Sequence, residues 1–412
     1  MLKAAALYIV IIVSLLIAVI SASLLTIAFY YRLEVQKKVR MDKLMTNMES
    51  GTAILLSESY NTNDEENVLD LYGDQRDSLI LNKTRWGVFD LQMVKAFELK
   101  DTLKRSFLSG NVFKDQGAIY LADEDRPLSV SGSTQITGNG ELPKAGLKQA
   151  YVDGRPYEGK ELIKGSIKSS GRELPALNDE LLKRISDHLK PTIEGIAFNI
   201  KDSVINSFFN KELIYKLQSG QQDIGPIKIK GKIILVSDTT IKISSSAVLE
   251  DVQIYAPAIV IESGFKGSCQ LFARDSIIIG RDCDFLYPSF AGIFKPDSST
   301  IQAKLSLDSA CHFSGMLLGH EPKRTDLQTL ISLGKNTLVN GEVYAGYIKV
   351  KRTASVQGKV YANRFIMQTP STLYENYLID ITLNRKLLSK YYLSSPIFKR
   401  DKSNQKILKW LN

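Results

Sequence analysis

The side chains best suited to metal or thiol chemistry are few, because the chain holds three histidines and three cysteines in 412 residues. Four of these six lie in one stretch of the second half: Cys283, Cys311, His312 and His320. Cysteine and histidine hold structural zinc, but such sites show closely spaced pairs such as Cys-x-x-Cys or His-x-x-x-His. No such pair occurs here. We therefore expect no metal site and no cofactor, and three cysteines exclude a disulfide-framed scaffold.

A second group of reactive side chains is acidic. Arg274-Asp275 and Arg281-Asp282-Cys283-Asp284 combine carboxylates with arginine, as calcium-binding and proton-transferring sites do. Both groups fall between predicted strands, where charged turns are common, so we interpret them as turns. His188 lies in a predicted amphipathic helix and is interpreted as a structural residue. There is no Gly-rich phosphate loop, no Gly-x-Ser-x-Gly and no His-Glu-x-x-His. We predict no catalytic residues.

The elements that would have to position these side chains are repeated short strands. Val339-Asn-Gly-Glu-Val-Tyr-Ala345 and Val356-Gln-Gly-Lys-Val-Tyr-Ala362 agree at five of seven positions, with Val356 in the place of Val339. Related phrases are Val252-Gln-Ile-Tyr-Ala256, Cys269-Gln-Leu-Phe-Ala273, Pro288-Ser-Phe-Ala-Gly292, Gly315-Met-Leu-Leu-Gly319 and, as an early outlier, Gly117-Ala-Ile-Tyr-Leu121. Alternating apolar residues that recur at about the interval between Val339 and Val356 indicate stacked coils, each with its own strands. An antiparallel sandwich is the alternative, since its strands are also regularly spaced.

Stacked coils make specific predictions for side chains. Val343 and Ala345 should point inward, with Tyr344 facing out and lying beside Tyr361 in an aromatic ladder. Tyr255 and Phe272 should form a second such ladder.

The same repeats predict roles for other residues. Gly341 and Gly358 should serve a tight turn or a close approach between coils. Cys269 is assigned to the register of Val343 as a small inward-facing residue. Two of the intervals between successive phrases are longer than the others by about ten residues each, and the extra residues lie at Lys295–Leu307 and His320–Leu333. Insertions at equivalent points of successive coils emerge on one face, so we expect a ledge that binds a partner.

These coils resemble the right-handed parallel β-helix, and more narrowly the bactofilin or polymer-forming type, whose coils carry Gly-x-Val-x-Ala phrases. The match is good over residues 339–365 and fair over 227–319. It implies a mainly β fold, with a β-solenoid over residues 115–371 and a helix inserted near 178–190. Residues 372–412 carry eight Lys or Arg against three acids and are expected to be a basic cap or tail, with Ile407–Leu411 as a short helix. Long insertions and this tail depart from bactofilins.

The opening of the chain predicts a membrane anchor. Ala4 to Tyr31 is a run of 28 residues without charge, proline or glycine, and about 20 suffice to span a bilayer. A cleaved signal peptide has a shorter apolar core, of about 7–15 residues. We therefore expect a transmembrane helix over 1–31, an amphipathic helical stem over 32–60 and a connecting region over 61–114.

A membrane helix that continues as a stem resembles type IV pilin-like proteins. Asn47-Met-Glu-Ser-Gly51 with Ala53-Ile-Leu-Leu56 resembles the PilX-like minor pilins, although the Gly-Phe processing site is missing and Ala5 stands where pilins carry glutamate. The resemblance implies an extracytoplasmic domain. The positive-inside rule, applied to the basic residues between Arg32 and Lys43, implies a cytoplasmic one. We expect a single-pass protein of the cell (inner) membrane, with its large domain outside the cytoplasm.

Composition and charge narrow the function further. With 44% hydrophobic and 24% charged residues, the chain is not disordered or collagen-like. The net charge of +9 is spread along the chain without a recognition motif, so we expect no nucleic-acid partner. We predict a structural or scaffolding protein of a pilus-like or cell-envelope assembly, with membrane lipid and either a protein partner or further copies of itself as partners. The alternatives are a tethered β-helix that binds or cleaves polysaccharide, and a cytoplasm-facing bactofilin-like polymer.

Overall fold

The computed structural model describes residues 2–60, 63–73, 77–191, 193–199, 203–218, 220, 222–368, 372–399 and 404–411. The chain is mainly β and forms two compact units. Unit 1 comprises Met1–Lys83 and Gln92–Arg105, and unit 2 comprises Thr84–Leu91 and Ser106–Asn412. The boundary between them passes within three strands, β2, β3 and β4. Each unit is described by itself.

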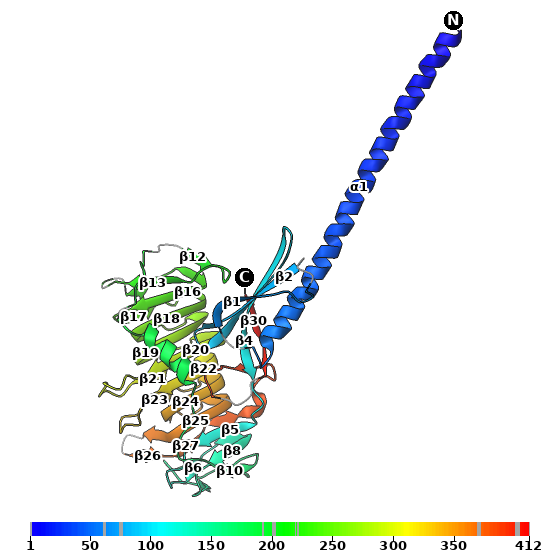
Figure 1. Cartoon of the computed structure of the whole chain (residues 1–412). Helices are drawn as coiled ribbons and strands as arrows, with labels where there is room; N and C mark the ends of the chain where they lie inside the picture. The colour runs from blue at the N-terminus through cyan, green and yellow to red at the C-terminus, as the bar shows by residue number, and fades with distance from the viewer. Residues whose placement is uncertain are drawn as a thin grey trace. The chain divides into compact units, whose positions relative to one another are not determined.

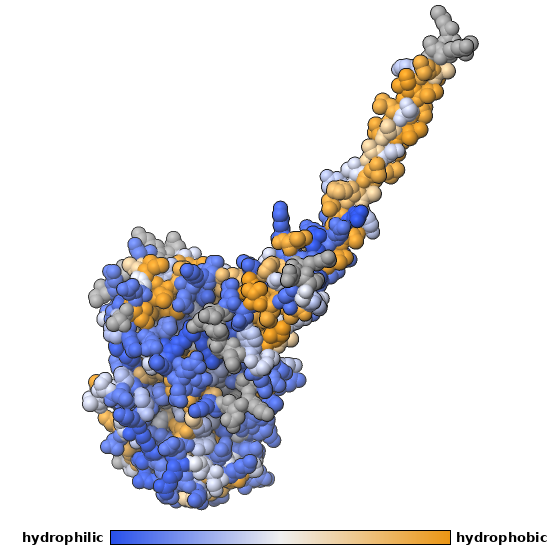
Figure 2. Space-filling model, in the orientation of Figure 1, coloured by the Kyte–Doolittle hydropathy of each residue, from blue (hydrophilic) through white to orange (hydrophobic). Residues whose placement is uncertain are grey.

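Unit 1 begins with one uninterrupted helix, α1 (Leu2–Leu56) (Figure 1). The predicted anchor and stem are therefore two parts of a single element. The apolar side chains of its N-terminal part are exposed, and the helix is long and apolar enough to cross a membrane. Figure 2 shows this part of the helix as mostly hydrophobic surface. The C-terminal part of the helix instead buries Leu44, Met48 and Leu55.

The segment 61–114, expected to be a connecting region, contains strands: β1 (Asn63–Leu69), β2 (Asp77–Trp86), β3 (Phe89–Glu98) and β4 (Asp101–Val112). Within unit 1, β1 and β2 pair antiparallel, with Leu69 opposite Leu79. Gly51 of α1 lies so close to this sheet that a Cβ atom there would be 2.8 Å from Val94 Cγ1. Burial alternates along β2, with Leu79 and Leu81 fully buried. The residue between them is the apolar Ile80, and the next residue of the buried face is Lys83, so the sequence of β2 lacks a clear period-2 pattern.

Unit 2 contains the remaining strands and two short helices. The strands are β5 (Gly117–Leu121), β6 (Leu128–Ser131), β7 (Gln135–Thr137), β8 (Asn139–Leu142), β9 (Leu147–Gln149), β10 (Ile167–Ser169), β11 (Ile196–Ala197), β12 (Ser203–Asn206), β13 (Leu213–Leu217), β14 (Asp223–Ile224), β15 (Lys228–Gly231), β16 (Ile233–Ser237), β17 (Ile241–Ile243), β18 (Val248–Ile261), β19 (Lys266–Ile279), β20 (Asp284–Phe294), β21 (Lys304–Leu307), β22 (His312–His320), β23 (Leu330–Leu333), β24 (Leu338–Val350), β25 (Ser355–Gln368), β26 (Leu373–Glu375), β27 (Tyr377–Ile379), β28 (Thr382–Asn384), β29 (Leu393–Ser394) and β30 (Gln405–Leu411). The helices are α2 (Asp179–His188) and the 3₁₀ helix η1 (Arg385–Leu387).

The long strands of unit 2 form a parallel ladder in the order β18, β19, β20, β22, β24, β25. The first column of residues in register is Ile254, Leu271, Ala291, Leu317, Val343 and Val360. The second is Ile259, Ile277, Leu305, Ile331, Ile348 and Phe365. Both columns belong to one buried core. The repeated phrases therefore mark successive parallel strands, and the antiparallel sandwich is excluded for this part of the chain.

One predicted register is wrong. Leu271, and not Cys269, shares the register of Val343. Cys269 lies opposite Val252 and is 1% exposed. Cys269 lies two residues before Leu271, so both side chains point to the same face of the strand. The prediction that Cys269 faces inward is therefore correct, although its predicted register is not.

The order of strands along the ladder differs from their order in the chain. The first phrase, in β5, pairs with the last one, in β25, placing Tyr120 opposite Tyr361. Strands β8 and β10 continue beyond β5, whereas β12 and β13 lie at the other end of the ladder (Figure 1). The chain therefore starts at one end, crosses to the far end through the segment that contains α2, and returns strand by strand.

The outward-facing residues of the ladder form a second core. Tyr344 does point away from the inner core, but it is only 8% exposed. Residues of α2 and of the C-terminal segment, such as Leu181 and Phe398, pack in the same cluster. The predicted ladder is confirmed at Tyr255 and Phe272, whose rings stack 4.4 Å apart at an angle of 6°. The rings of Tyr344 and Tyr361 lie 6.0 Å apart.

The C-terminal segment differs from its prediction. Residues Ile407–Leu411, expected to be a helix, belong to β30, which pairs antiparallel with β4. Trp410 lies opposite Phe107, and their rings are 5.3 Å apart. Periodicity cannot assign a short apolar run to helix or strand. The unpaired edge of β4 is what determines the strand here.

Candidate functional site

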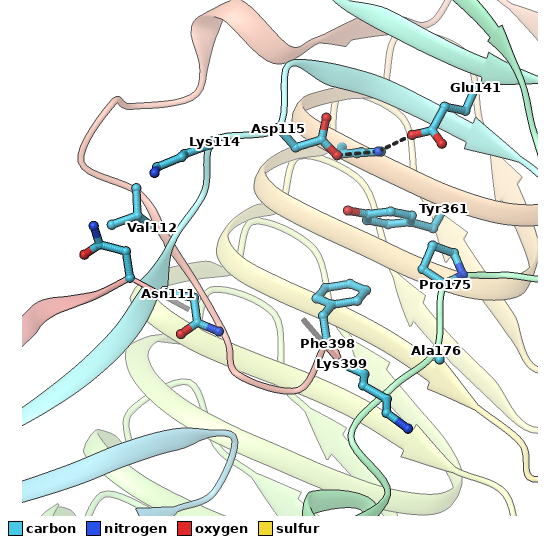
Figure 3. Close-up of a pocket in the computed structure, with 12 residues that line it drawn as sticks. Asn111, Val112, Lys114, Asp115, Glu141, Pro175, Ala176, Tyr361, Phe398 and Lys399 are labelled. Carbon is cyan, nitrogen blue, oxygen red and sulfur yellow. Dashed lines mark hydrogen bonds and ion pairs between the residues drawn. The ribbon is translucent and has the colours of Figure 1, made fainter. Parts of the chain in front are cut away.

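A cavity of about 420 Å³ lies in unit 2 where several distant segments meet. Its walls come from the end of β4 and the link to β5, from β8, from the residues before α2, from β25 and from the C-terminal segment. Figure 3 shows the lining side chains: Asn111, Val112, Lys114, Asp115, Glu141, Pro175, Ala176, Lys359, Tyr361, Phe398, Lys399 and Asn404. We call it the lysine cavity, because Lys359 is its central charge.

Lys359 holds the two carboxylates of the lysine cavity. Its Nζ atom is 2.5 Å from Asp115 Oδ2 and 2.8 Å from Glu141 Oε1, and it lies 4.9 Å from the centre of the Tyr361 ring. The lysine side chain is 3% exposed, whereas those of Asp115 and Glu141 are 42% and 38% exposed. A buried ammonium needs such partners, because losing water without compensation is costly. The carboxylates thus neutralise the lysine at the rim of the cavity.

The electrostatics of this triad favour the ionised form of Asp115. Partial burial alone would raise the pKa of Asp115, but the charge and hydrogen bond of Lys359, with the N–H of Gly117, outweigh it and hold that pKa below its usual range. The two carboxylate oxygens both bind one nitrogen, at 2.5 and 2.8 Å, so they lie no farther apart than the sum of these distances. Retaining glycosidases place their carboxyl groups about 5–5.5 Å apart, but one must be an acid of raised pKa. Asp115 has the opposite shift.

A buried glutamate lies next to Lys359 in the ladder. Glu342 of β24 is opposite Lys359 of β25 and is completely buried. It accepts hydrogen bonds from Ser394 Oγ at 2.5 Å and from the Tyr392 hydroxyl at 3.3 Å. Burial, followed by the charge of Glu342, raises the pKa of Tyr392, so its hydroxyl keeps the proton that it donates. These bonds hold the C-terminal segment on the ladder.

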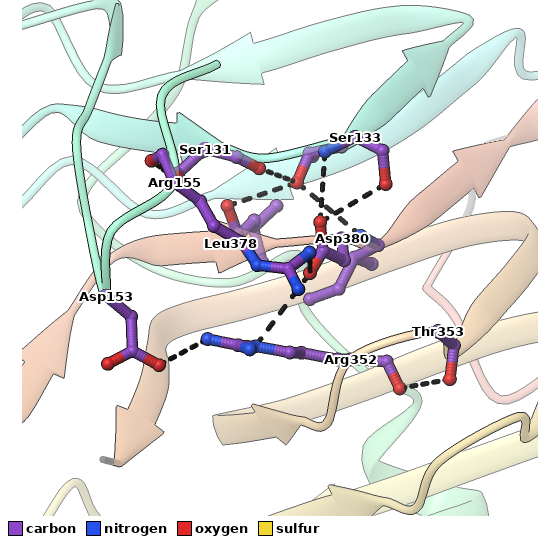
Figure 4. A network of polar contacts seen from close by, with 10 residues as sticks. Ser131, Ser133, Asp153, Arg155, Arg352, Thr353, Leu378 and Asp380 are labelled. Carbon is purple, nitrogen blue, oxygen red and sulfur yellow. Dashed lines mark hydrogen bonds and ion pairs between the residues drawn. The ribbon is translucent and has the colours of Figure 1, made fainter. Parts of the chain in front are cut away.

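A second polar network joins the first strands of unit 2 to the last (Figure 4). The side chain of Asp380 is 7% exposed and accepts from the backbone N–H of Ser133 at 3.0 Å and from Arg155 Nη1 at 2.9 Å. Arg352, from the turn between β24 and β25, lies 3.8 Å from the same carboxylate and also pairs with Asp153. Three segments far apart in the sequence therefore meet at one carboxylate.

The cysteines and histidines of the possible zinc site do not form a metal centre. Cys283 and Cys311 are buried, His312 is exposed, and His320 lines a different cavity of about 390 Å³. Burial lowers the pKa of His320 to about 4. Among the described residues, no group of three or more His, Cys, Asp or Glu side chains is placed to hold a metal ion. His188 stacks on Tyr255 with ring centres 5.1 Å apart.

The acidic groups occupy two different settings. Arg281 and Asp282 are exposed in the turn before β20, and Arg281 lies 3.8 Å from Asp308 of a neighbouring turn. Asp282 has a φ of +56°, as turn residues often do. Arg274 and Asp275, predicted between strands, lie instead inside β19.

The two insertions are shorter than predicted, because β21 and β23 take up their last residues. The remaining loops, 295–303 and 321–329, lie against each other. Lys295 Nζ donates to Leu327 O at 2.9 Å, and Gln302 Nε2 donates to Gln328 O at 3.0 Å. They therefore emerge side by side, as the repeat predicted. Ile301 and Leu327 are 75% and 48% exposed on them.

Sequence reasoning missed the residues of both polar networks. A signal for Lys359 was present, because Glu342 and Lys359 occupy the same position of the repeated phrase, in the interior of a strand. The partners of Lys359 are Asp115 and Glu141, which lie 244 and 218 residues away in the sequence, and no local pattern marks them.

Comparisons with known proteins do not assign this chain to a family. No family model matches the sequence, and no curated protein matches it. Among solved structures, the chain is similar to the competence-associated pilin ComZ from Thermus thermophilus, with 8% sequence identity and a TM-score of 0.22. The similarity covers 85% of this chain and 88% of that one. A TM-score this low does not establish a shared fold.

Proposed function

We propose that this protein is a membrane-anchored structural protein, a component of a pilus-like or cell-envelope assembly. In this proposal the parallel ladder of unit 2 is a right-handed β-helix that is presented to a protein partner or to further copies of the chain. The observation that carries the proposal is α1, a continuous helix whose first half is apolar and exposed and whose second half is packed against a sheet within unit 1. Such an element joins a membrane to a folded body without a hinge.

A structural role also fits the polar groups of unit 2. The carboxylates of the lysine cavity are engaged in holding Lys359, and Asp380 holds three chain segments together. An enzyme of the polysaccharide-cleaving class would need a carboxyl of raised pKa facing its substrate, and at the lysine cavity Asp115 has a lowered pKa. Tethered polysaccharide binding remains the second proposal, with the lysine cavity as its groove.

The basic residues after the anchor divide into two groups in unit 1. Arg40 pairs with Asp101 at 2.9 Å, and Lys43 lies over the ring of Tyr72. At about 1.5 Å per residue they lie roughly 13 and 18 Å beyond Tyr31, outside the Debye length of about 8–10 Å. The group nearer to the membrane is exposed and consists of Arg32, Lys37 and Lys38. We propose that this nearer group contacts anionic lipid headgroups.

Sidedness is tested by reporters fused after residue 412. An extracytoplasmic domain, as we propose, makes a reporter that works only outside the cytoplasm active, and leaves a cytoplasm-only reporter inactive. The reverse result would support the bactofilin-like alternative. The anchor is tested separately, by washing membranes with high salt and alkaline carbonate. Release of the full chain by either wash would contradict a spanning helix.

The partner-binding role of the loops is tested by substitution. Deletion is unsuitable, since Lys295 is 4% exposed and its ammonium bonds the second loop. We propose Ile301→Asp combined with Leu327→Asp, with Leu286→Asp as the matched control, because Leu286 is 55% exposed on β20. In-cell cross-linking should give a discrete larger species for wild type and the control, and lose it for the loop variant. Equal cross-linking in all three would remove the loops from the proposal.

A further inference from the structure

Two of the three thiols of the chain lie in neighbouring positions of the ladder. Cys283 immediately precedes β20 and Cys311 immediately precedes β22, and these strands pair in parallel with Asp284 opposite His312. The N–H of His312 donates to the carbonyl oxygen of Cys283 at 2.8 Å. Paired strands are about 4.8 Å apart. This spacing falls within the range of about 4.4–6.8 Å that separates the Cα atoms of a disulfide.

The two thiols are buried and interact with each other. Cys283 is 1% exposed and Cys311 is fully buried, and Cys311 Sγ donates to Gly280 O at 2.9 Å. Cys283 Sγ donates to Glu262 O at 3.2 Å. The neighbouring Cys311 thiol lowers the pKa of Cys283 to about 7, against the effect of burial, and Cys283 in turn raises the pKa of Cys311. The thiolate is the form that attacks disulfides, and the lowered pKa makes Cys283 the more easily ionised member of the pair.

The third thiol is a natural comparison. Cys269 lies within β19, opposite Val252, and burial raises its pKa to about 12. It has no neighbouring cysteine in register among the described strands, and it is a thiol at neutral pH. Cys283 and Cys311 differ from Cys269 in two ways: they neighbour each other in the ladder, and the pKa of Cys283 is lowered whereas that of Cys269 is raised.

We propose that Cys283 and Cys311 form a disulfide when the protein meets a small disulfide oxidant. The Cys283 thiolate attacks one sulfur of the oxidant and expels the other half as a thiol. The Cys311 thiol, losing its proton, then attacks the Cys283 sulfur and expels the second half. Two protein thiols become one S–S bond, and one oxidant disulfide becomes two thiols. The bond closes a loop that contains the first insertion, 295–303, and joins two successive strands of the ladder at its base.

This inference is independent of the proposed function, because it concerns the purified protein. Full-length protein in detergent is incubated with glutathione disulfide, in urea below the unfolding transition so that the buried site opens. It is then acidified, denatured and alkylated, and thiols and cross-linked peptides are identified by mass spectrometry. We expect one alkylated thiol, at Cys269, and a linked pair of peptides from Cys283 and Cys311, about 2 Da lighter than the reduced pair.

Variants separate this bond from other oxidation. Cys269→Ser should form the same linked pair and leave no alkylated thiol. Cys283→Ser should leave both remaining thiols free, whereas Cys311→Ser should stop at the mixed disulfide of Cys283 with glutathione. If a serine variant fails to fold, wild type alone decides, because its oxidised form should unfold at a higher urea concentration than its reduced form. Three alkylated thiols in oxidised wild type, or a bridge that includes Cys269, would overturn the proposal.

Discussion

Substitution of Gly341 by alanine tests the close approach of neighbouring strands. Gly341 has a φ of +147°, and a Cβ atom there would lie 1.8 Å from the carbonyl oxygen of Gly315 in the next strand. Gly315 has the same conformation, with a Cβ position 1.8 Å from Ser289 O, and Gly358 continues the column. Only a residue without a side chain fits where backbone meets backbone at this distance.

The cost follows from this geometry. Contacts of a Cβ atom below 3.0 Å are essentially never seen, so the strands must separate until the 1.8 Å contact has opened to at least that distance. A nearby ladder hydrogen bond, from Leu338 N to Cys311 O, is 2.8 Å long and would exceed bonding distance after such a shift. Two buried groups left unpaired cost about 1–3 kcal/mol each, and the positive φ adds about 1 kcal/mol. We expect Gly341→Ala to destabilise unit 2 by about 3–7 kcal/mol.

Gly264→Ala is the matched control. Gly264 also has a positive φ, +85°, but nothing lies within 4 Å of its Cβ position. Gly264→Ala should be destabilised only by the cost of placing a side chain at positive φ, about 1 kcal/mol. The chain has two tryptophans, Trp86 and Trp410, and both belong to unit 2. Their fluorescence in urea should show a midpoint lower by about 1 M or more for Gly341→Ala. Equal midpoints for the two variants would refute the close approach.

Three further substitutions test the polar networks and unit 1. The pKa of Asp115 is lowered in the folded chain, so its contribution is complete above the unfolded pKa of about 3.9 and declines as pH falls below it, through the folded value. Asp115→Asn should therefore lower the urea midpoint at pH 7, by less than about 1 kcal/mol since the carboxylate bound to Lys359 is 42% exposed, and the difference from wild type should shrink steadily as pH falls below about 3.9. Asp380→Asn should cost about 2 kcal/mol, as expected for hydrogen bonds to a buried charge. Asp308→Asn, at a side chain that is 55% exposed, should cost less than about 0.5 kcal/mol. Similar losses in the two variants would contradict a stabilising role for the polar network around Asp380. Leu55→Ala removes a fully buried side chain of α1 and should cost about 2–5 kcal/mol, seen as faster hydrogen exchange in β2; unchanged exchange would argue against packing of this part of the helix.

Much of the local structure could be predicted from the repeats. Val343, Tyr344 and Ala345 alternate as expected, and the stacking of Tyr255 on Phe272 followed from their equivalent positions in two successive phrases. Identical phrases at a fixed spacing constrain both the direction and the register of neighbouring strands. The register of Cys269 was misjudged, because residues two apart in a strand have the same burial and periodicity does not distinguish them.

Other elements could not be predicted, because their partners are distant. Ile407–Leu411 is a strand only because β4 offers it an edge. The strands of residues 61–114 alternate weakly and depend on packing within the fold. For Lys359, a buried charge implied that some carboxylate must neutralise it, but the identity of Asp115 and Glu141 depends on the joining of β5 to β25.

By itself, the sequence determined a long apolar N-terminal helix and a set of parallel, in-register strands. Both are encoded in local patterns: the length of an uncharged run, and a phrase of alternating apolar residues that recurs along the chain. Only the tertiary structure decided that the first phrase lies beside the last. The reason is that the ladder accepts a strand at either end with the same backbone hydrogen bonds, so the sequence of one phrase does not specify its neighbour. Contacts between distant segments accompany that pairing, of Lys359 with Asp115 and Glu141 and of Asp380 with Arg155, and they form only in the folded chain.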